Sequence, residues 1–273
     1  MQNSLKILII GDISGNLGLA MLQAYIGKLK DRYKVDGIIV NGENSADQGK
    51  GITPKIVAFL KNLGVNIITT GNHIWAKKEI MPYLESNTDL LRPANFPSGC
   101  PGVGVTTFEC AGEVVAVVNL QGRIFMRESV ECPFRAIDSI LTYLKSKTNK
   151  IIVDFHAEAT SEKIGMGLYL DGRVSTVVGT HTHVQTADER ILPAGTAFIT
   201  DLGMVGSLNS MIGMKKEPIL KNFITQMPQK FEVSEEAPAV LSGIVAEIDK
   251  ATGKAIDIQR VRIVDDTIKP VRL

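Results

Sequence analysis

The chain has 273 residues, of which 44% are hydrophobic and 22% are charged, an ordinary globular composition. Its 30 basic and 29 acidic residues give a formal net charge of +1, which argues against binding nucleic acid or lipid through bulk charge. No stretch approaches the roughly 20 apolar residues of a membrane span, and residues 7–10 are too short for a signal-peptide core. Three cysteines without metal-type spacing fit a reducing compartment. We therefore expect a cytoplasmic protein with no membrane partner.

The first half of the chain alternates strand and helix patterns. Residues 6–10 and 37–40 predict two strands, and apolar residues at helical spacing between them predict a helix. Thr53 and Pro54 suit the cap and first position of a second helix, which Gly64 is placed to end. Residues 66–70 predict a third strand. This βαβαβ order predicts a parallel sheet with right-handed crossovers.

The second half adds hairpins to this pattern. Residues 92–104 hold three prolines and three glycines and predict a loop, as does the polar segment 226–238. Pro133 begins a further helix. Strands are predicted at residues 105–109, 114–120, 151–155, 176–178, 196–200, 239–248 and 255–264. We predict a single α/β domain over residues 1–273, in which two packed, mixed β-sheets are flanked by helices.

Metal-ligating side chains follow the predicted strands. All four histidines, two carboxylates and two asparagines stand in this context, in the blocks Gly11-Asp12, Gly42-Glu43-Asn44, Gly71-Asn72-His73, His156 and Gly179-Thr180-His181-Thr182-His183. Ligands of open α/β sheets bind outside the carboxyl ends of the strands, so we expect these side chains to converge. A nitrogen and oxygen set without thiolate favours manganese, iron or zinc over calcium.

The spacing also suggests individual roles. A carboxylate such as Glu43 can bridge two ions roughly 3.5–4 Å apart, which would supply hydroxide for attack on phosphorus. His181 and His183 are separated by one residue, so in extended backbone both rings would point to one face. His73 follows Asn72 directly, and its side chain should point elsewhere. We therefore expect it to steady the phosphate or to protonate the leaving oxygen.

Simpler explanations exist for each residue taken alone. Asp12 could cap a loop, Asn44 could be a turn residue, and His156 could be a buried structural histidine. It is the complete ordered set that favours a metal site. The sequence has no complete dinucleotide fingerprint, no phosphate loop and no Gly-x-Ser-x-Gly nucleophile turn.

These blocks resemble those of the calcineurin-like metallophosphoesterases, and most of all the YmdB-like branch of bacterial 2′,3′-cyclic-nucleotide phosphodiesterases. The general superfamily has Asp-x-His and Gly-Asp blocks, whereas this chain has Asp12-Ile13-Ser14 and Gly42-Glu43, and the YmdB-like branch shares both departures. The resemblance implies a four-layer α-β-β-α sandwich with His73 as the catalytic histidine. It implies a first ion held by Asp12, Glu43, Asn44 and His183, and a second held by Glu43, Asn72, His156 and His181.

The resemblance implies a phosphodiesterase with two divalent or trivalent ions, iron or manganese before zinc. Small cyclic nucleotides would be its substrates, 2′,3′-cyclic monophosphates first and 3′,5′-cyclic ones as a further candidate. Arg123 is a candidate substrate-binding residue, although a solvated arginine explains it equally well. Two other functions stay open: a phosphomonoesterase or protein phosphatase, and a regulatory metal-binding protein that binds an RNA-processing partner. Formation of a homo-oligomer is also left open.

Overall fold

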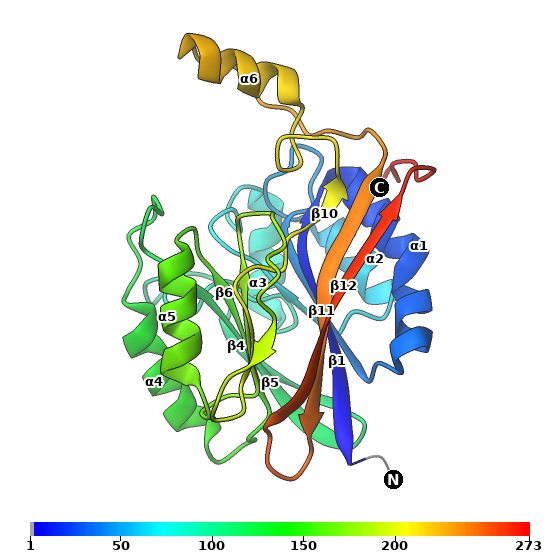
Figure 1. The fold of residues 1–273 in the computed structure, drawn as a ribbon. Helices are drawn as coiled ribbons and strands as arrows, with labels where there is room; N and C mark the ends of the chain where they lie inside the picture. Colours follow the sequence, from blue (N-terminus) through cyan, green and yellow to red (C-terminus); the bar gives the residue numbers. More distant parts are fainter. Residues whose placement is uncertain (1–2) are drawn as a thin grey trace.

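The computed structural model describes residues 3–273, which form two six-stranded sheets packed face to face (Figure 1). The elements in chain order are β1 (Ser4–Ser14), α1 (Gly15–Tyr33), β2 (Gly37–Asn44), α2 (Pro54–Asn62), β3 (Ile67–Thr69), the 3₁₀ helix η1 (Lys78–Ile80), α3 (Met81–Ser86), β4 (Val105–Cys110), β5 (Glu113–Gln121), α4 (Pro133–Leu144), β6 (Ile151–His156), α5 (Thr160–Leu170), β7 (Thr176–Thr180), β8 (Arg190–Ile191), β9 (Ala197–Ile199), β10 (Met204–Ser207), α6 (Lys216–Thr225), β11 (Ala239–Asp249) and β12 (Ala255–Asp265).

Both sheets are mixed. The first has the order β12-β11-β10-β1-β2-β3, with β1, β2, β3 and β10 parallel and β11 antiparallel to its neighbours. The second has the order β4-β5-β6-β7-β9-β8, with a parallel centre and an antiparallel strand at each edge. The parallel strands therefore bring their carboxyl ends to one edge of each sheet.

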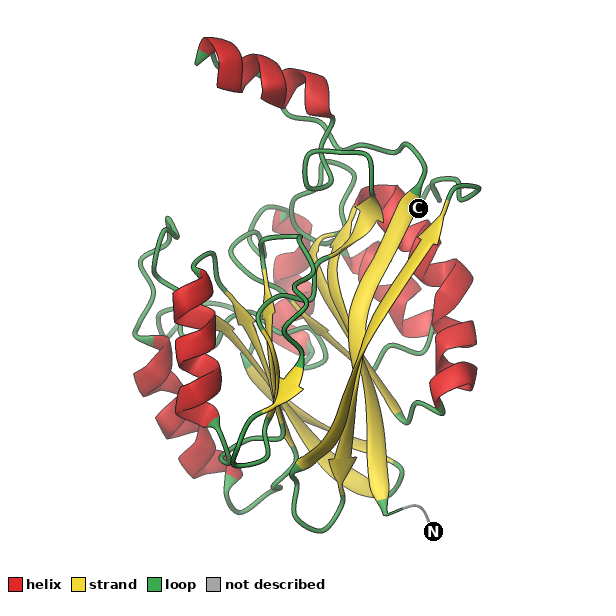
Figure 2. Cartoon of the chain, in the orientation of Figure 1, coloured by secondary structure: helices red, strands yellow, loops and turns green. Residues whose placement is uncertain are grey.

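The alternation of side chains along β1 explains the layering. Ile7 and Ile9 face the second sheet and join the apolar core between the sheets, whereas Leu8 and Ile10 face helices α1 and α2. A third apolar core lies between the second sheet and helices α4 and α5. Figure 2 shows the result as helix, sheet, sheet and helix layers. The predicted fold class is confirmed.

The local signals were accurate where the pattern was strong. Thr53 caps α2, since its hydroxyl oxygen accepts a hydrogen bond from the Ile56 amide at 3.3 Å. The helices η1, α3, α5 and α6 and the strands β8 and β10 were not predicted. Glycines at 165 and 167 weaken the helical pattern of α5, and Gly167 is needed there because a side chain would overlap the Phe198 ring. None of the helices in residues 3–273 combines the length and apolar character needed to cross a bilayer.

Cys110 at the end of β4 belongs to the core between the sheets, and burial raises the pKa of its thiol to about 11. Alkylation proceeds through the thiolate. We therefore predict that iodoacetamide at pH 8 modifies Cys110 slowly in the native protein and rapidly in urea. Peptide mass spectrometry measures both rates, with the partly exposed Cys100 and Cys132 as internal references. Equal native rates at all three residues would contradict the prediction.

Candidate metal centre

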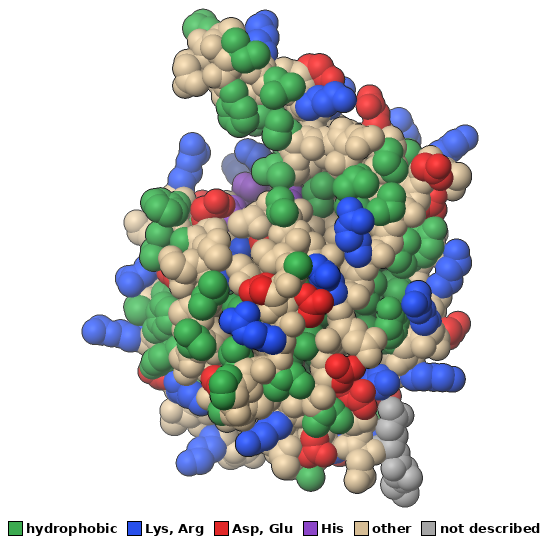
Figure 3. All heavy atoms as spheres, in the orientation of Figure 1, with side chains coloured by type: hydrophobic (Ala, Val, Ile, Leu, Met, Phe, Trp, Pro, Cys, Tyr) green, Lys and Arg blue, Asp and Glu red, His purple; other side chains and the backbone are tan. Residues whose placement is uncertain are grey.

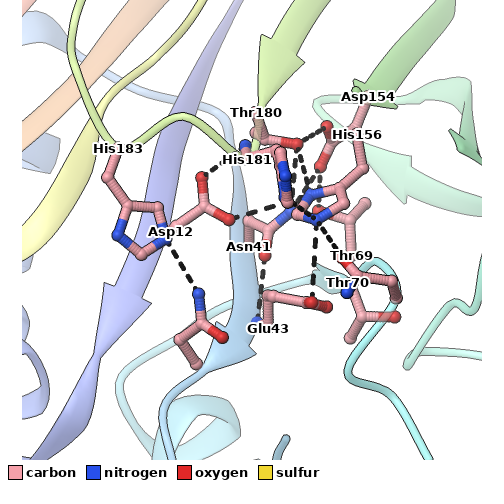
Figure 4. Close-up of polar contacts among 12 residues, drawn as sticks. Asp12, Asn41, Glu43, Thr69, Thr70, Asp154, His156, Thr180, His181 and His183 are labelled. Atoms are coloured by element: carbon pink, nitrogen blue, oxygen red, sulfur yellow. Dashed lines mark hydrogen bonds and ion pairs between the residues drawn. The ribbon is translucent and has the colours of Figure 1, made fainter. Parts of the chain in front are cut away.

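The predicted site residues meet where the carboxyl edges of the two sheets adjoin. Asp12 lies in β1, Glu43 and Asn44 end β2, and His156 ends β6. Asn72 and His73 follow β3, while His181 and His183 follow β7. Figure 4 shows the Asp12 carboxylate between His183 and His156. The first sheet thus supplies mainly oxygen atoms, and the second supplies imidazole nitrogens.

Three potential ligand atoms surround Nε2 of His156, whose side chain is fully buried. His181 Nδ1 lies 3.1 Å from it, Asn72 Oδ1 3.2 Å and Glu43 Oε1 3.6 Å. Two atoms bound to one ion at about 2.1 Å are separated by about 3.0–3.4 Å. The four residues predicted to hold the second ion therefore have nearly the spacing of a coordination shell.

Hydrogen bonds on the far side of each ring determine the tautomers. The Thr180 hydroxyl donates to Asp154 Oδ1 at 2.7 Å, so it accepts from His156 Nδ1–H at 3.0 Å. His181 Nε2 lies 3.1 Å from the Glu158 carboxylate and carries the other proton. The lone pairs of His156 Nε2 and His181 Nδ1 then face one another, an arrangement that a cation between them would stabilise.

Two carboxylate oxygens provide an independent test of whether the site fits a metal. Asp12 Oδ1 and Glu43 Oε2 are buried and have no hydrogen-bond partner within residues 3–273. A buried unpaired carboxylate oxygen is costly, and a bound cation would compensate it. In the part of the chain that the structure describes, no three His, Cys, Asp or Glu side chains form a ligand group on their own. An ion here would therefore also need the amide oxygens.

Asn44 is held between two histidines. Its Nδ2 lies 2.8 Å from His183 Nε2, and its Oδ1 lies 2.8 Å from His73 Nδ1. Because His183 Nδ1–H donates to the Ile212 carbonyl at 2.8 Å, His183 Nε2 is the acceptor of the Asn44 amide. The ligand atoms of the first predicted set are thus less convergent than those of the second. The Asn44 side chain must rotate before its Oδ1 and His183 Nε2 can bind the same ion.

The loop that carries His181 and His183 is not extended. The expectation that both rings point to one face of an extended strand was therefore wrong. β7 ends at Thr180, and φ is +100° at His181 and +66° at His183, both in the left-handed region. The His181 amide donates to Asp12 Oδ2 at 3.1 Å, which helps to hold this strained backbone. Both rings reach the site from a turn rather than from strand alternation.

Burial sets the protonation of the cluster. It raises the pKa of Asp12 well above its usual value, and the neighbouring Asp201, Asp154 and Glu43 carboxylates add to the effect. It lowers the pKa of His156 far below its usual value, and it also lowers the pKa of His181 and His183. The three imidazoles are therefore neutral at pH 7, which is the form that binds metal.

The sequence analysis missed the residues behind the predicted ligands. Asp154 accepts hydrogen bonds from Asn41 Nδ2 at 3.1 Å and from the hydroxyls of Thr69 and Thr180. Asn41 also accepts the Glu43 amide at 3.0 Å. These contacts fix both the His156 tautomer and the Glu43 backbone, as is common behind metal ligands. The sequence held one signal for Asp154, which is a charged residue inside an apolar strand. It stands two positions before His156, and its side chain therefore lies on the same face of the strand.

A buried ion pair supports the histidine loop from behind. Lys163 Nζ of α5 lies 2.5 Å from Asp201 Oδ2, and both side chains are 1% exposed. The same oxygen accepts the Thr182 amide at 3.2 Å and the Thr182 hydroxyl at 2.7 Å, while Oδ1 accepts the Gly203 amide at 2.8 Å. Asp201 thus ties α5 to the loop between the two histidines. The 38 residues that separate Lys163 from Asp201 conceal this pair in the sequence.

Arg123 lies beside the cluster but not among its contacts. The Gly122 amide donates to the His156 carbonyl at 2.9 Å, so the chain after β5 runs along the site. The Arg123 amide donates to the Glu162 carboxylate at 3.0 Å, and its side chain is exposed. Its predicted role in substrate binding stays a prediction.

This chain is similar to known proteins over nearly its whole length. A family model described as YmdB-like protein matches residues 8–261. The chain is 50% identical over 262 residues to the 2′,3′-cyclic-nucleotide 2′-phosphodiesterase of Bacillus subtilis strain 168, covering 96% of this chain and 98% of that protein. A crystal structure described as a novel phosphatase, from Mycoplasma pneumoniae, superposes with a TM-score of 0.91 at 39% identity, covering 97% of this chain and 95% of that one. A hypothetical protein from Thermus thermophilus superposes with a TM-score of 0.87, also at 39% identity, covering 96% and 100%.

Gly71 offers a test of the packing around His156, because a Cβ atom there would overlap the His156 ring. We predict that Gly71→Ala displaces the imidazole and weakens manganese binding by about 10-fold or more. Calorimetric titration of the purified protein measures the affinity. Gly27→Ala is the matched control, since a Cβ at Gly27 meets no atom within 4 Å. Equal affinity in the two variants would contradict the assigned geometry.

Lys163→Met tests the support of the histidine loop. Removing the ammonium leaves Asp201 as a buried, uncompensated charge, which should lower the free energy of unfolding by about 3–5 kcal/mol. We also predict weaker manganese binding, because Asp201 positions Thr182 between the two histidines.

The double variant Lys163→Met with Asp201→Asn removes the unpaired charge and should regain much of the lost stability, but not the metal affinity. Urea unfolding and calorimetric titration separate the two effects. Lys215→Met, which breaks an exposed pair with Glu232 at 2.8 Å, is the control and should change neither quantity appreciably. Full metal affinity in the double variant would rule out a positioning role.

Proposed function

Because this chain belongs to the YmdB-like protein family, we propose that it is a metal-dependent phosphodiesterase that hydrolyses nucleoside 2′,3′-cyclic phosphates. The observation that carries the proposal is the group of lone-pair donors around His156 Nε2, at 3.1, 3.2 and 3.6 Å. The Bacillus subtilis relative, half identical over nearly the whole chain, supports the choice of substrate.

The residues present fit two ions. We assign Glu43, Asn72, His156 and His181 to one, and Asp12, Glu43, Asn44 and His183 to the other, so that Glu43 belongs to both sets. The buried oxygens of Asp12 and Glu43 that have no hydrogen-bond partner among the described residues support this assignment. Iron or manganese suits the mixed nitrogen and oxygen set, with zinc as the alternative. When bound, such ions lower the pKa of water towards neutrality and neutralise charge on the phosphate.

His73 is positioned to act on the substrate. Its amide donates to Glu43 Oε1 at 2.7 Å, and its Nδ1 lies 2.8 Å from Asn44 Oδ1 and 3.1 Å from Glu43 Oε1. These contacts fix the ring and leave Nε2 for the substrate, and the side chain is 30% exposed. As water adds to phosphorus and one ribose oxygen departs, a protonated His73 would donate its Nε2 proton to that oxygen. The cyclic diester is thereby opened to a monoester.

One observation favours a second candidate activity. The Mycoplasma pneumoniae protein, similar over 97% of this chain, is described as a phosphatase. A ligand cluster of this kind acts on phosphorus and does not select between monoesters and diesters, because substrate choice depends on the surrounding walls. Phosphomonoester hydrolysis is therefore the alternative against which the diesterase proposal has to be tested.

The proposal predicts that manganese-loaded protein converts 2′,3′-cyclic AMP to a monophosphate, measured by chromatography of the products. His181→Ala and Asn72→Ala each remove a ligand from the set around His156, so turnover should fall by about 10³-fold or more. Both variants should still unfold cooperatively. Asn149→Ala is the control, because Asn149 precedes β6 at the opposite edge of the sheet and is exposed.

Unchanged turnover in His181→Ala would overturn the site assignment. Wild-type protein that hydrolyses 4-nitrophenyl phosphate but neither 2′,3′-cyclic AMP nor bis(4-nitrophenyl) phosphate would replace the diesterase proposal with the monoesterase alternative. Wild-type protein that binds manganese but hydrolyses none of the three would leave the regulatory function as the better explanation.

A further inference from the structure

A cavity of about 330 Å³ adjoins the candidate metal centre and includes His183 in its wall. Its other lining residues include Val184, Ile212 in the segment before α6, and Arg260 and Arg262 of β12. Figure 3 shows histidine at the surface below the projecting helix α6, next to hydrophobic side chains. We propose that this cavity holds the nucleobase of the substrate, an inference that rests on the proposed phosphodiesterase function.

The position of the cavity relative to the candidate metal centre suits the order of the parts of a nucleotide. His183 Nε2 contacts Asn44, which also contacts His73, so this side of the ring faces the proposed phosphate position. His183 Nδ1 binds the Ile212 carbonyl on the cavity side. One imidazole ring therefore separates the two compartments, as one ribose ring separates the phosphate of a nucleoside 2′,3′-cyclic phosphate from its base.

The size and walls of the cavity suit a planar aromatic group. Small-molecule sites span about 300–1,000 Å³, and a cavity at the lower end fits one base rather than an oligonucleotide. Val184 and Ile212 are 59% and 49% exposed, which is unusual for apolar side chains at a polar site. Their aliphatic surfaces would pack on the faces of a base, whereas they would leave a hydrated phosphate without partners.

The two arginines of the cavity differ in whether other protein groups already bind their guanidinium groups. Arg260 Nε lies 3.3 Å from the Glu189 carboxylate, and Arg260 also donates to the Thr186 carbonyl. Arg262 stands two residues further along β12, on the same face, and is exposed. Over residues 3–273 it forms no ion pair. Its planar guanidinium can therefore stack on a base or donate to ring nitrogens and carbonyl oxygens.

Ser242 lines the same cavity as Arg262. It is the cross-strand partner of Arg262 between β11 and β12, and it is only 3% exposed. Its hydroxyl adds a donor and acceptor for the edge of a base. Apolar walls, one uncommitted guanidinium and a small hydroxyl together form a recognition surface for a base and not for a second phosphate.

The test is a binding measurement that does not depend on turnover. Calorimetric titration of manganese-loaded protein with adenosine 3′-monophosphate and with inorganic phosphate gives a ratio of affinities. In the wild type, the nucleotide should bind at least about 10-fold more tightly than phosphate. Arg262→Ala should reduce that ratio by about 10-fold. Arg32→Ala, an exposed arginine near the end of α1, is the matched control and should leave the ratio unchanged.

Arg262→Lys separates base stacking from simple charge, because lysine keeps the charge but loses the planar group. The inference requires that lysine does not restore the ratio, and full restoration would overturn it in favour of a phosphate contact. Equal wild-type binding of nucleotide and phosphate would also overturn it. If turnover of cyclic nucleotides fails while nucleotide binding still depends on Arg262, the proposed activity falls and the base subsite stands.

Discussion

Buried negative charge where the two sheets meet is the constraint on which the site depends. Asp12, Glu43 and Asp154 are all 2% exposed or less, and burial raises the pKa of Asp12 and of Asp154. Hydrogen bonds from Asn41, Thr69 and Thr180 satisfy Asp154. Within the described residues 3–273, Asp12 and Glu43 each keep one oxygen without a hydrogen-bond partner. The nearby rings of His156 and His181 turn lone pairs rather than N–H groups towards the same region. A protein that needed only stability would place donors there, and this arrangement is instead suited to a cation.

The same constraint couples the site to the docking of the sheets. The His181 amide of the second sheet donates to Asp12 of the first, and Asn41 of the first donates to Asp154 of the second. Apolar side chains between the sheets, such as Ile9 and Val178, hold these polar pairs in register. An ion that takes oxygens from one sheet and nitrogens from the other would add directly to the stability of their packing. Metal binding and global stability should therefore be linked in this fold.

The sequence predicted what depends on local pattern. Strand periodicity placed the ligand blocks at strand ends, and the family resemblance supplied the fold and the grouping of ligands. Local pattern could not predict the left-handed backbone of His181 and His183. That backbone depends on contacts with Asp12 and Asp201, which are distant in the sequence. The same distance concealed the Lys163–Asp201 pair. Confirmation extends to the fold class and the family, whereas the roles of single residues and the single domain over residues 1–273 stay predictions.

If both proposals hold, His183 would take part in metal binding and in recognition of the base. The two ring nitrogens of His183 face different compartments, with Nε2 towards Asn44 and Nδ1 towards the Ile212 carbonyl. Ile212 lies in the left-handed region, with φ at +48°, in the segment that leads to the projecting helix α6. A base that packs against Ile212 would act on the carbonyl that orients His183. Occupation of the cavity would then influence how Asn44 and His183 share an ion, which couples recognition of the base to formation of the less convergent ligand set.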